Sequence, residues 1–95
     1  MEFDRPGKTL MIRADMDALP VQEIEGRSYG SLTPGKMHAC GHDGHTSVAL
    51  MVAGLLANHR SELKGKIKMV FQPAEEIVAG AKLMMEEGVL KDSVP

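Results

Sequence analysis

The chain has very few aromatic residues, a single cysteine and no long apolar run. Its 95 residues include two phenylalanines, one tyrosine and no tryptophan, whereas eight methionines supply flexible apolar side chains. One cysteine cannot form an internal disulfide, which fits a reducing compartment or use of the thiol as a ligand. No apolar run approaches the roughly 20 residues of a membrane span, and the N-terminus has no apolar signal region. We therefore expect a cytoplasmic protein with no membrane partner.

The sequence also has no large excess of charge of either sign. The formal net charge is −2, and acidic and basic residues are interspersed along the chain. A nucleic-acid-binding protein would be expected to show a basic patch or stripe, so we predict no nucleic-acid partner. A hydrophobic content of 43% is typical of a globular chain, and the length limits it to one small domain.

What the sequence does contain is a dense group of potential metal ligands in residues 38–45, His-Ala-Cys-Gly-His-Asp-Gly-His. Thiolate and imidazole are ligands suited to zinc and neighbouring transition metals. Cys40 and His42 are separated only by Gly41, which permits the tight curvature that brings both to one ion. Each of these residues alone is more typical of a polar loop with a buried small thiol and surface histidines than of a metal site. The cluster as a whole favours a metal site.

Two short apolar segments, residues 8–14 and 66–72, are typical of strands. The first has a continuously apolar centre, as expected of a strand covered on both faces. The second ends at Pro73, because proline cannot donate to a strand ladder. Residues 21–37 between strand and cluster predict an irregular connection, and loops of that length are often functional.

Helical periodicity follows the cluster and recurs near the C-terminus. The first helix is expected to begin with Asp43 or Thr46 as its N-cap and to run to about Arg60. A second helix is expected from about residue 78 to 87. The apolar face of the first helix is predicted to consist of Val48, Met51, Val52, Leu55, Leu56 and His59. The order β-loop-α-β-α predicts an α/β fold with a parallel strand pair.

This topology brings three polar clusters to one edge of the sheet. The pair Asp15 and Asp17 follows the first strand, residues 38–45 precede the helix, and Glu75 with Glu76 follows the second strand. Open α/β sheets place their sites beyond the carboxyl ends of their strands. We therefore expect the three clusters to converge.

The chemistry of the carboxylates depends on whether a metal is nearby. Glu75 and Glu76 could form a solvated helix start, and Asp15 with Asp17 could form a turn ending the strand. Beside a metal, one glutamate could ligate while its neighbour accepts a proton from water. One aspartate could then orient a ligand.

Three motifs together identify a family resemblance: Arg13–Pro20 (Arg-Ala-Asp-Met-Asp-Ala-Leu-Pro), His38–His45, and Phe71–Glu76 (Phe-Gln-Pro-Ala-Glu-Glu). In this order and spacing they closely resemble the aminoacylase/carboxypeptidase family of two-metal hydrolases, peptidase family M20. The similarity is to its branch of N-acyl-amino-acid amidohydrolases, hippurate hydrolases and auxin-conjugate hydrolases.

The resemblance implies hydrolysis of an amide in a small N-acylated amino acid or peptide-like substrate. By position, Cys40, His42 and Glu76 resemble metal ligands, Glu75 the general base, and Asp17 the carboxylate that orients a ligand. The cofactor implied is a divalent metal, namely zinc, manganese, cobalt or nickel. The family uses two ions, of which this chain could hold one by itself. Residues that could support a ligand or face the substrate are Asp15, His38, Asp43 and His45.

The family pattern extends beyond this chain. We expect residues 1–95 to form part of a three-layer zinc-peptidase-like catalytic domain, without the lid domain and the C-terminal part that carries two further histidine ligands. Open strand edges then predict a homo-oligomer. Two alternatives remain open: an inactive fragment acting as a self-associating structural module, and a thiol-reactive protein in which histidines and a helix N-terminus lower the pKa of Cys40.

Overall fold

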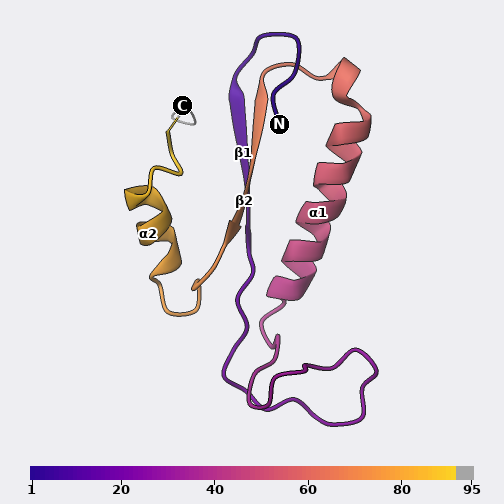
Figure 1. The fold of residues 1–95 in the computed structure, drawn as a ribbon, viewed down its shortest axis with the longest axis vertical. Coiled ribbons are helices and arrows are strands. Elements are labelled where there is room, and N and C mark those ends of the chain that lie inside the picture. Colours follow the sequence, from indigo (N-terminus) through magenta and orange to yellow (C-terminus); the bar gives the residue numbers. More distant parts are fainter. Residues whose placement is uncertain (92–95) are drawn as a thin grey trace.

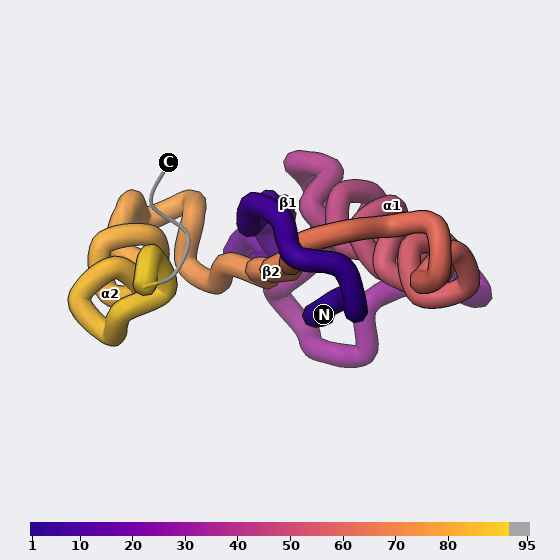
Figure 2. The backbone as a smooth tube through the Cα atoms, turned by 90° about the horizontal axis from the view of Figure 1, so that it is seen from above, coloured from indigo at the N-terminus to yellow at the C-terminus, as the bar shows by residue number. Residues whose placement is uncertain are grey.

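A small parallel sheet lies between two helices in the computed structural model, which describes residues 1–91 (Figure 1). Strands β1 (Thr9–Asp15) and β2 (Lys66–Gln72) pair in parallel along their whole lengths, ending with Asp15 opposite Gln72. The view from above shows helices α1 (His42–Asn58) and α2 (Gly80–Glu86) on opposite sides of this pair (Figure 2). The predicted α/β class, element order and parallel pairing are therefore confirmed.

The long connection between β1 and α1 is closed at its base by an isolated bridge. Leu19 and Met37 exchange two backbone hydrogen bonds, of 2.9 and 3.1 Å between nitrogen and oxygen. The intervening residues project beyond the carboxyl ends of the strands (Figure 1). Because the bridge fixes both ends of this loop, it brings the residues after β1 close to the residues before α1.

Helix α1 begins without the side-chain cap that the sequence predicts. Its N-cap is Gly41, in the left-handed region at φ 89°, and no side chain caps the helix. The prediction of Asp43 or Thr46 as the cap is therefore wrong. Thr46 instead donates a hydrogen bond from Oγ1 to the backbone oxygen of Asp15, at 3.0 Å, and so ties the helix to the end of β1.

The predicted apolar face of α1 is only partly the face that packs on the sheet. Ala49 is buried and Val52 and Leu56 are half-buried, but Val48, Met51 and Leu55 are exposed. The helix is apolar on two sides, and a two-stranded sheet covers only one of them. Another of the predicted residues, His59, is also exposed and ends the helix next to Glu62.

The N-terminal segment covers the start of β2 on the side away from β1. The Met1 amine donates a hydrogen bond to the Ile67 oxygen at 2.7 Å, and the backbone nitrogen of Phe3 donates to the Gly65 oxygen. The side chain of Phe3 is buried. The chain nevertheless forms a thin slab, with a radius of gyration of 16.3 Å, against about 12 Å for a compact domain of this length. No helix within residues 1–91 is long and apolar enough to cross a membrane.

Helix α2 begins two residues later than its periodicity predicts. A turn occupies residues 75–78, and the backbone nitrogens of Ala79 and Gly80 both donate to the Ala74 oxygen. Gly80 lies against the end of β2, since an added Cβ would be only 1.6 Å from the Pro73 carbonyl oxygen. The close approach requires glycine and fixes the segment that carries Glu75 and Glu76.

We predict that Gly80→Ala destabilises the fold by about 1–3 kcal/mol, because the new methyl group must displace the Pro73 backbone. The matched control is Gly54→Ala in α1, where nothing lies within 4 Å of the added Cβ. That control should instead stabilise by about 0.5–1 kcal/mol through helix propensity. Urea unfolding followed by circular dichroism measures both effects. Equal stabilisation by the two substitutions would contradict the packing of α2 described above.

Candidate metal centre

The three polar clusters meet beyond the carboxyl ends of β1 and β2, as the topology predicts. Asp15 is the last residue of β1, His42 is the first of α1, and Glu76 lies in the turn after β2. The backbone of Gly41 turns the chain between Cys40 and His42, which agrees with the curvature expected of this glycine.

Cys40, His42 and Glu76 form a group whose potential ligand atoms all lie within 4.8 Å of one another. Nε2 of His42 lies 3.8 Å from Oε1 of Glu76. That oxygen is buried and has no hydrogen-bond partner among the described residues. Leaving a carboxylate oxygen buried without a hydrogen bond is unfavourable, so this atom fits a metal ligand better than a structural contact. The residue types also fit, because a thiol, an imidazole and a carboxylate are the usual ligands of zinc.

Asp17 connects His42 to the turn that carries Glu76. Its Oδ1 lies 3.2 Å from Nδ1 of His42, and its Oδ2 accepts a hydrogen bond of 3.1 Å from the backbone nitrogen of Glu76. Burial raises the pKa of Asp17, but hydrogen bonds from the backbone N–H groups of Glu76 and Glu75 outweigh it and leave the pKa lowered. The ionised carboxylate and the backbone oxygen of Asp17, which lies 3.1 Å from Nδ1, together hold this nitrogen and leave Nε2 of His42 available to the group above.

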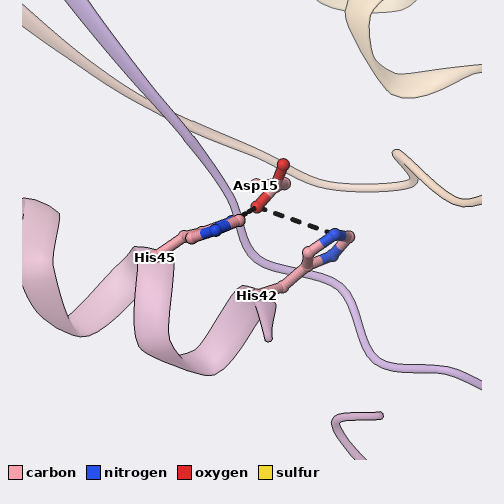
Figure 3. A group of neighbouring side chains, drawn as sticks. All are labelled: Asp15, His42 and His45. Atoms are coloured by element: carbon pink, nitrogen blue, oxygen red, sulfur yellow. Dashed lines mark hydrogen bonds and ion pairs between the residues drawn. The ribbon is translucent and has the colours of Figure 1, made fainter. Parts of the chain in front are cut away.

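Asp15 lies near the other ring nitrogen of His42, Nε2. Its Oδ1 lies 3.7 Å from Nε2 of His42 and 2.6 Å from Nδ1 of His45, so both imidazoles point at one carboxylate (Figure 3). Its Oδ2 pairs with Nη1 of Arg13 at 3.0 Å. The hydrogen bond from His45 lowers the pKa of Asp15 despite burial, and the charges of His42, His45 and Arg13 act in the same direction.

Carboxylates dominate the electrostatics around His42. Three of them, from Asp15, Glu75 and Glu76, lie 3.7–3.8 Å from its Nε2. Burial lowers the pKa of this imidazole, but the charge of Asp15 and the hydrogen bonds to Asp17 outweigh it and leave the pKa raised. A position surrounded by this much negative charge favours a cation at Nε2.

The Cys40 thiol is in an acidic rather than a basic environment. The Glu76 carboxylate raises the pKa of the thiol, first as a hydrogen-bond acceptor and then as a negative charge, and burial acts in the same direction. The expectation that histidines and the helix N-terminus lower this pKa is therefore wrong in direction. Histidines lie near Cys40 in sequence, but the charges that act on its thiol in space are the carboxylates of Glu76, Glu75 and Asp15.

The remaining predicted residues divide between the group and its surroundings. Glu75 lies at the group with its side chain 40% exposed, and its Oε2 is 3.8 Å from Nε2 of His42. His38 and Asp43 are exposed and lie in the wall of an adjoining cavity of about 340 Å³ instead. Within residues 1–91, the carboxylate of Asp43 makes no hydrogen bond or ion pair.

Reasoning from the sequence missed two residues near the site, Arg13 and Gln72. Arg13 bonds Asp15 and also donates from Nε to Oε1 of the buried Gln72, at 2.9 Å. The available signal was a charged residue inside an apolar strand, two positions before Asp15 and therefore on the same face. Arg13 therefore holds the Asp15 carboxylate in place and is itself fixed by Gln72.

Comparison with known proteins shows relatives of high sequence identity. The chain is 57% identical over 81 residues to IAA-amino acid hydrolase ILR1-like 5 of Arabidopsis thaliana, covering 85% of this chain and 19% of that protein. It is 52% identical over 84 residues to N-acetylcysteine deacetylase of Bacillus subtilis (strain 168), covering 88% and 22%. The chain thus spans about a fifth of the length of these curated relatives.

A solved structure shows the same fold at closely related sequence. It is the Bacillus subtilis YXEP protein, described as a dinuclear metal binding peptidase from the M20 family, with a TM-score of 0.91 and 48% identity. The alignment covers 97% of this chain and 26% of that one. The family profile described as "Peptidase family M20/M25/M40" matches residues 11–94, which is nearly the whole sequence. The chain therefore belongs to peptidase family M20/M25/M40.

Proposed function

We propose that this chain supplies part of the catalytic domain of a metal-dependent amidohydrolase that cleaves the amide bond of N-acylated amino acids. The observation that carries the proposal is the Cys40, His42 and Glu76 group with its buried carboxylate oxygen, which has no hydrogen-bond partner among the described residues. The names of the relatives, an IAA-amino acid hydrolase and an N-acetylcysteine deacetylase, support this substrate class.

In this proposal Cys40, His42 and Glu76 hold one divalent ion, which is zinc, manganese, cobalt or nickel. The dinuclear metal binding described for the similar peptidase supports metal use. When bound, such an ion polarises a carbonyl group and lowers the pKa of water. Three protein ligands leave the open position that a catalytic zinc site requires. A second ion would need ligands beyond those that this group offers.

The two remaining carboxylates take different roles because their surroundings differ. Asp17 orients His42 through Nδ1 and is tied to the Glu76 backbone, so both its carboxylate oxygens are engaged in supporting the ligands. Glu75 keeps its carboxylate partly exposed beside the group, where it can take a proton from water and return it to the leaving amine. The cavity with His38 and Asp43 in its wall is lined by none of the proposed ligands, and it offers room for a part of the substrate away from the scissile bond.

We predict that Asp17→Asn lowers zinc affinity about 10–100-fold, because the residue that orients His42 loses its charge. Asp43→Asn is the matched control, since the Asp43 carboxylate makes no contact within the described residues. Competition with a chromophoric chelator measures both affinities. Indistinguishable zinc affinities for the two variants would contradict the role of Asp17.

Glu75→Gln tests the general base separately from metal binding. Hydrolysis of N-acetyl-L-cysteine by the zinc-loaded chain should fall about 10²–10⁴-fold, because an amide cannot accept the proton. Bound zinc should stay at the wild-type level by elemental analysis. Glu62→Gln is the control at an exposed glutamate far from the site, and it should leave the rate unchanged. Unchanged hydrolysis by Glu75→Gln would remove Glu75 from the mechanism.

A second candidate function, self-association as a structural module without catalysis, is favoured by the exposed apolar side of α1. Val48, Met51 and Leu55 are 60, 74 and 60% exposed, respectively. Exposed apolar side chains gathered on one helix are typical of a contact surface. Association also fits the proposed hydrolase as a homo-oligomer, so the oligomeric state alone does not separate the two functions. Measurements of zinc content and turnover separate the hydrolase from the structural module.

We predict that multi-angle light scattering gives a mass above that of one chain at micromolar concentration. Met51→Glu should shift the chain toward the monomer by placing a charge on the exposed apolar side of α1. Ala57→Glu adds the same charge at another exposed position of the helix and should not. A monomeric wild-type chain would contradict the predicted oligomer.

The thiol-reactive alternative has less support, since acidic neighbours raise the pKa of Cys40 and so reduce its thiolate fraction. We place the protein in the cytoplasm, where a lone reduced thiol can serve as a ligand.

A further inference from the structure

A second carboxylate–histidine pair lies beside the candidate metal centre, and its imidazole has no role in the function proposed above. Asp15 is only 7% exposed, and both its carboxylate oxygens are engaged. Oδ1 faces Nδ1 of His45 at 2.6 Å, and Oδ2 faces Nη1 of Arg13 at 3.0 Å. The side chain of His45, in contrast, is 61% exposed. The imidazole is therefore held at one nitrogen by Asp15 (Figure 3), while most of its side chain is exposed.

The anchor determines which nitrogen of His45 carries the hydrogen. An ionised carboxylate can only accept hydrogen bonds, so Nδ1 of His45 must be the donor. In the neutral ring Nε2 is then an acceptor. Among residues 1–91 this Nε2 has no hydrogen-bond partner. His42 has the same arrangement, with Nδ1 against Asp17 and Nε2 free for the group with Glu76.

The position of His45 places its ring next to that of His42, one of the proposed metal ligands. Its ring is stacked on the ring of His42, with centroids 5.9 Å apart and an angle of 26° between the planes. Asp15, His42 and His45 also lie close enough to be considered as cation ligands. However, Oδ1 of Asp15 already accepts from His45, and the guanidinium of Arg13 is 3.0 Å from Oδ2. An ion there would break the first contact and meet the charge of the second, so these contacts favour a neutral hydrogen-bond donor as the ligand of His45.

We propose that His45 is a substrate-binding residue whose Nε2 accepts a hydrogen bond from the amide N–H of an N-acylated amino acid. Asp15 is its positioning residue. The inference rests on the proposed function, which supplies the substrate class. The amide N–H is adjacent to the carbonyl that is cleaved, so a contact at this point fixes the orientation of the scissile bond. It also distinguishes amides from esters, which have no hydrogen at that position.

The first test compares binding of an amide and its ester analogue. Zinc-loaded Glu75→Gln chain is titrated with N-acetyl-L-alanine and with 2-acetoxypropanoate, which replaces the N–H by oxygen, and the Glu75→Gln background suppresses turnover. We expect the amide to bind about tenfold more tightly, and the further change His45→Ala to remove that preference by weakening only amide binding. Adding Glu62→Gln instead should leave the preference intact. Equal binding of amide and ester, or a preference that survives His45→Ala, would overturn the inference while leaving the proposed function standing. Binding of neither compound would refute the proposed function and the inference with it.

The second test measures the hydrogen bond between Asp15 and His45 in spectra recorded without substrate. Long-range ¹H–¹⁵N spectra of the histidine rings in the zinc-loaded chain should show His45 with its hydrogen on Nδ1. Asp15→Asn should shift the Nδ1 and Nε2 signals of His45, because the amide replaces a charged acceptor. It should also reduce the preference for the amide. The matched control is Glu62→Gln, which replaces the charged acceptor 2.9 Å from Nδ1 of His59 by an amide and should alter the His59 signals alone. A neutral His45 with its hydrogen on Nε2 would overturn the proposal.

Discussion

The carboxylate of Asp17 is the contact on which the geometry of the site depends. It follows β1, yet one of its oxygens bonds His42 at the start of α1 and the other bonds the backbone after β2. A charged acceptor with two donors from different segments has little freedom to rotate. Three parts of the chain that are distant in sequence are therefore held in a single relative position. Nε2 of His42 and the Glu76 carboxylate face each other as a consequence.

Much of the fold could be predicted because local signals agree with one another. Each strand contains a run of three apolar residues, and Pro73 marks the end of the second where the ladder ends. The parallel order follows from the helix between them, and it brings the polar clusters to one edge. The start of α2 could not be predicted, because it depends on a tertiary contact. Periodicity extends to residue 78, but the close approach of Gly80 to Pro73 determines where the turn ends.

The errors at the site have a similar cause. Sequence proximity groups His38 with His45, but only His45 lies on α1, one turn after His42 and within reach of Asp15. His38 precedes the helix and faces the adjoining cavity. The pKa of Cys40 depends on Glu76, a residue from another segment, so counting adjacent histidines gave the wrong sign. Residue types identified the chemistry, whereas tertiary contacts determine which atoms take part.

The bridge between Leu19 and Met37 separates the long loop from the polar edge of the sheet. Once a loop is closed at its base, doubling its length costs only about 0.6 kcal/mol of additional entropy. Insertions and substitutions between these two residues can therefore reshape the rim of the cavity without moving Asp17 or Cys40. Proteins with such a closed loop can change which molecules enter the cavity, through evolution or by loop grafting, while the chemical groups at the sheet edge stay constant.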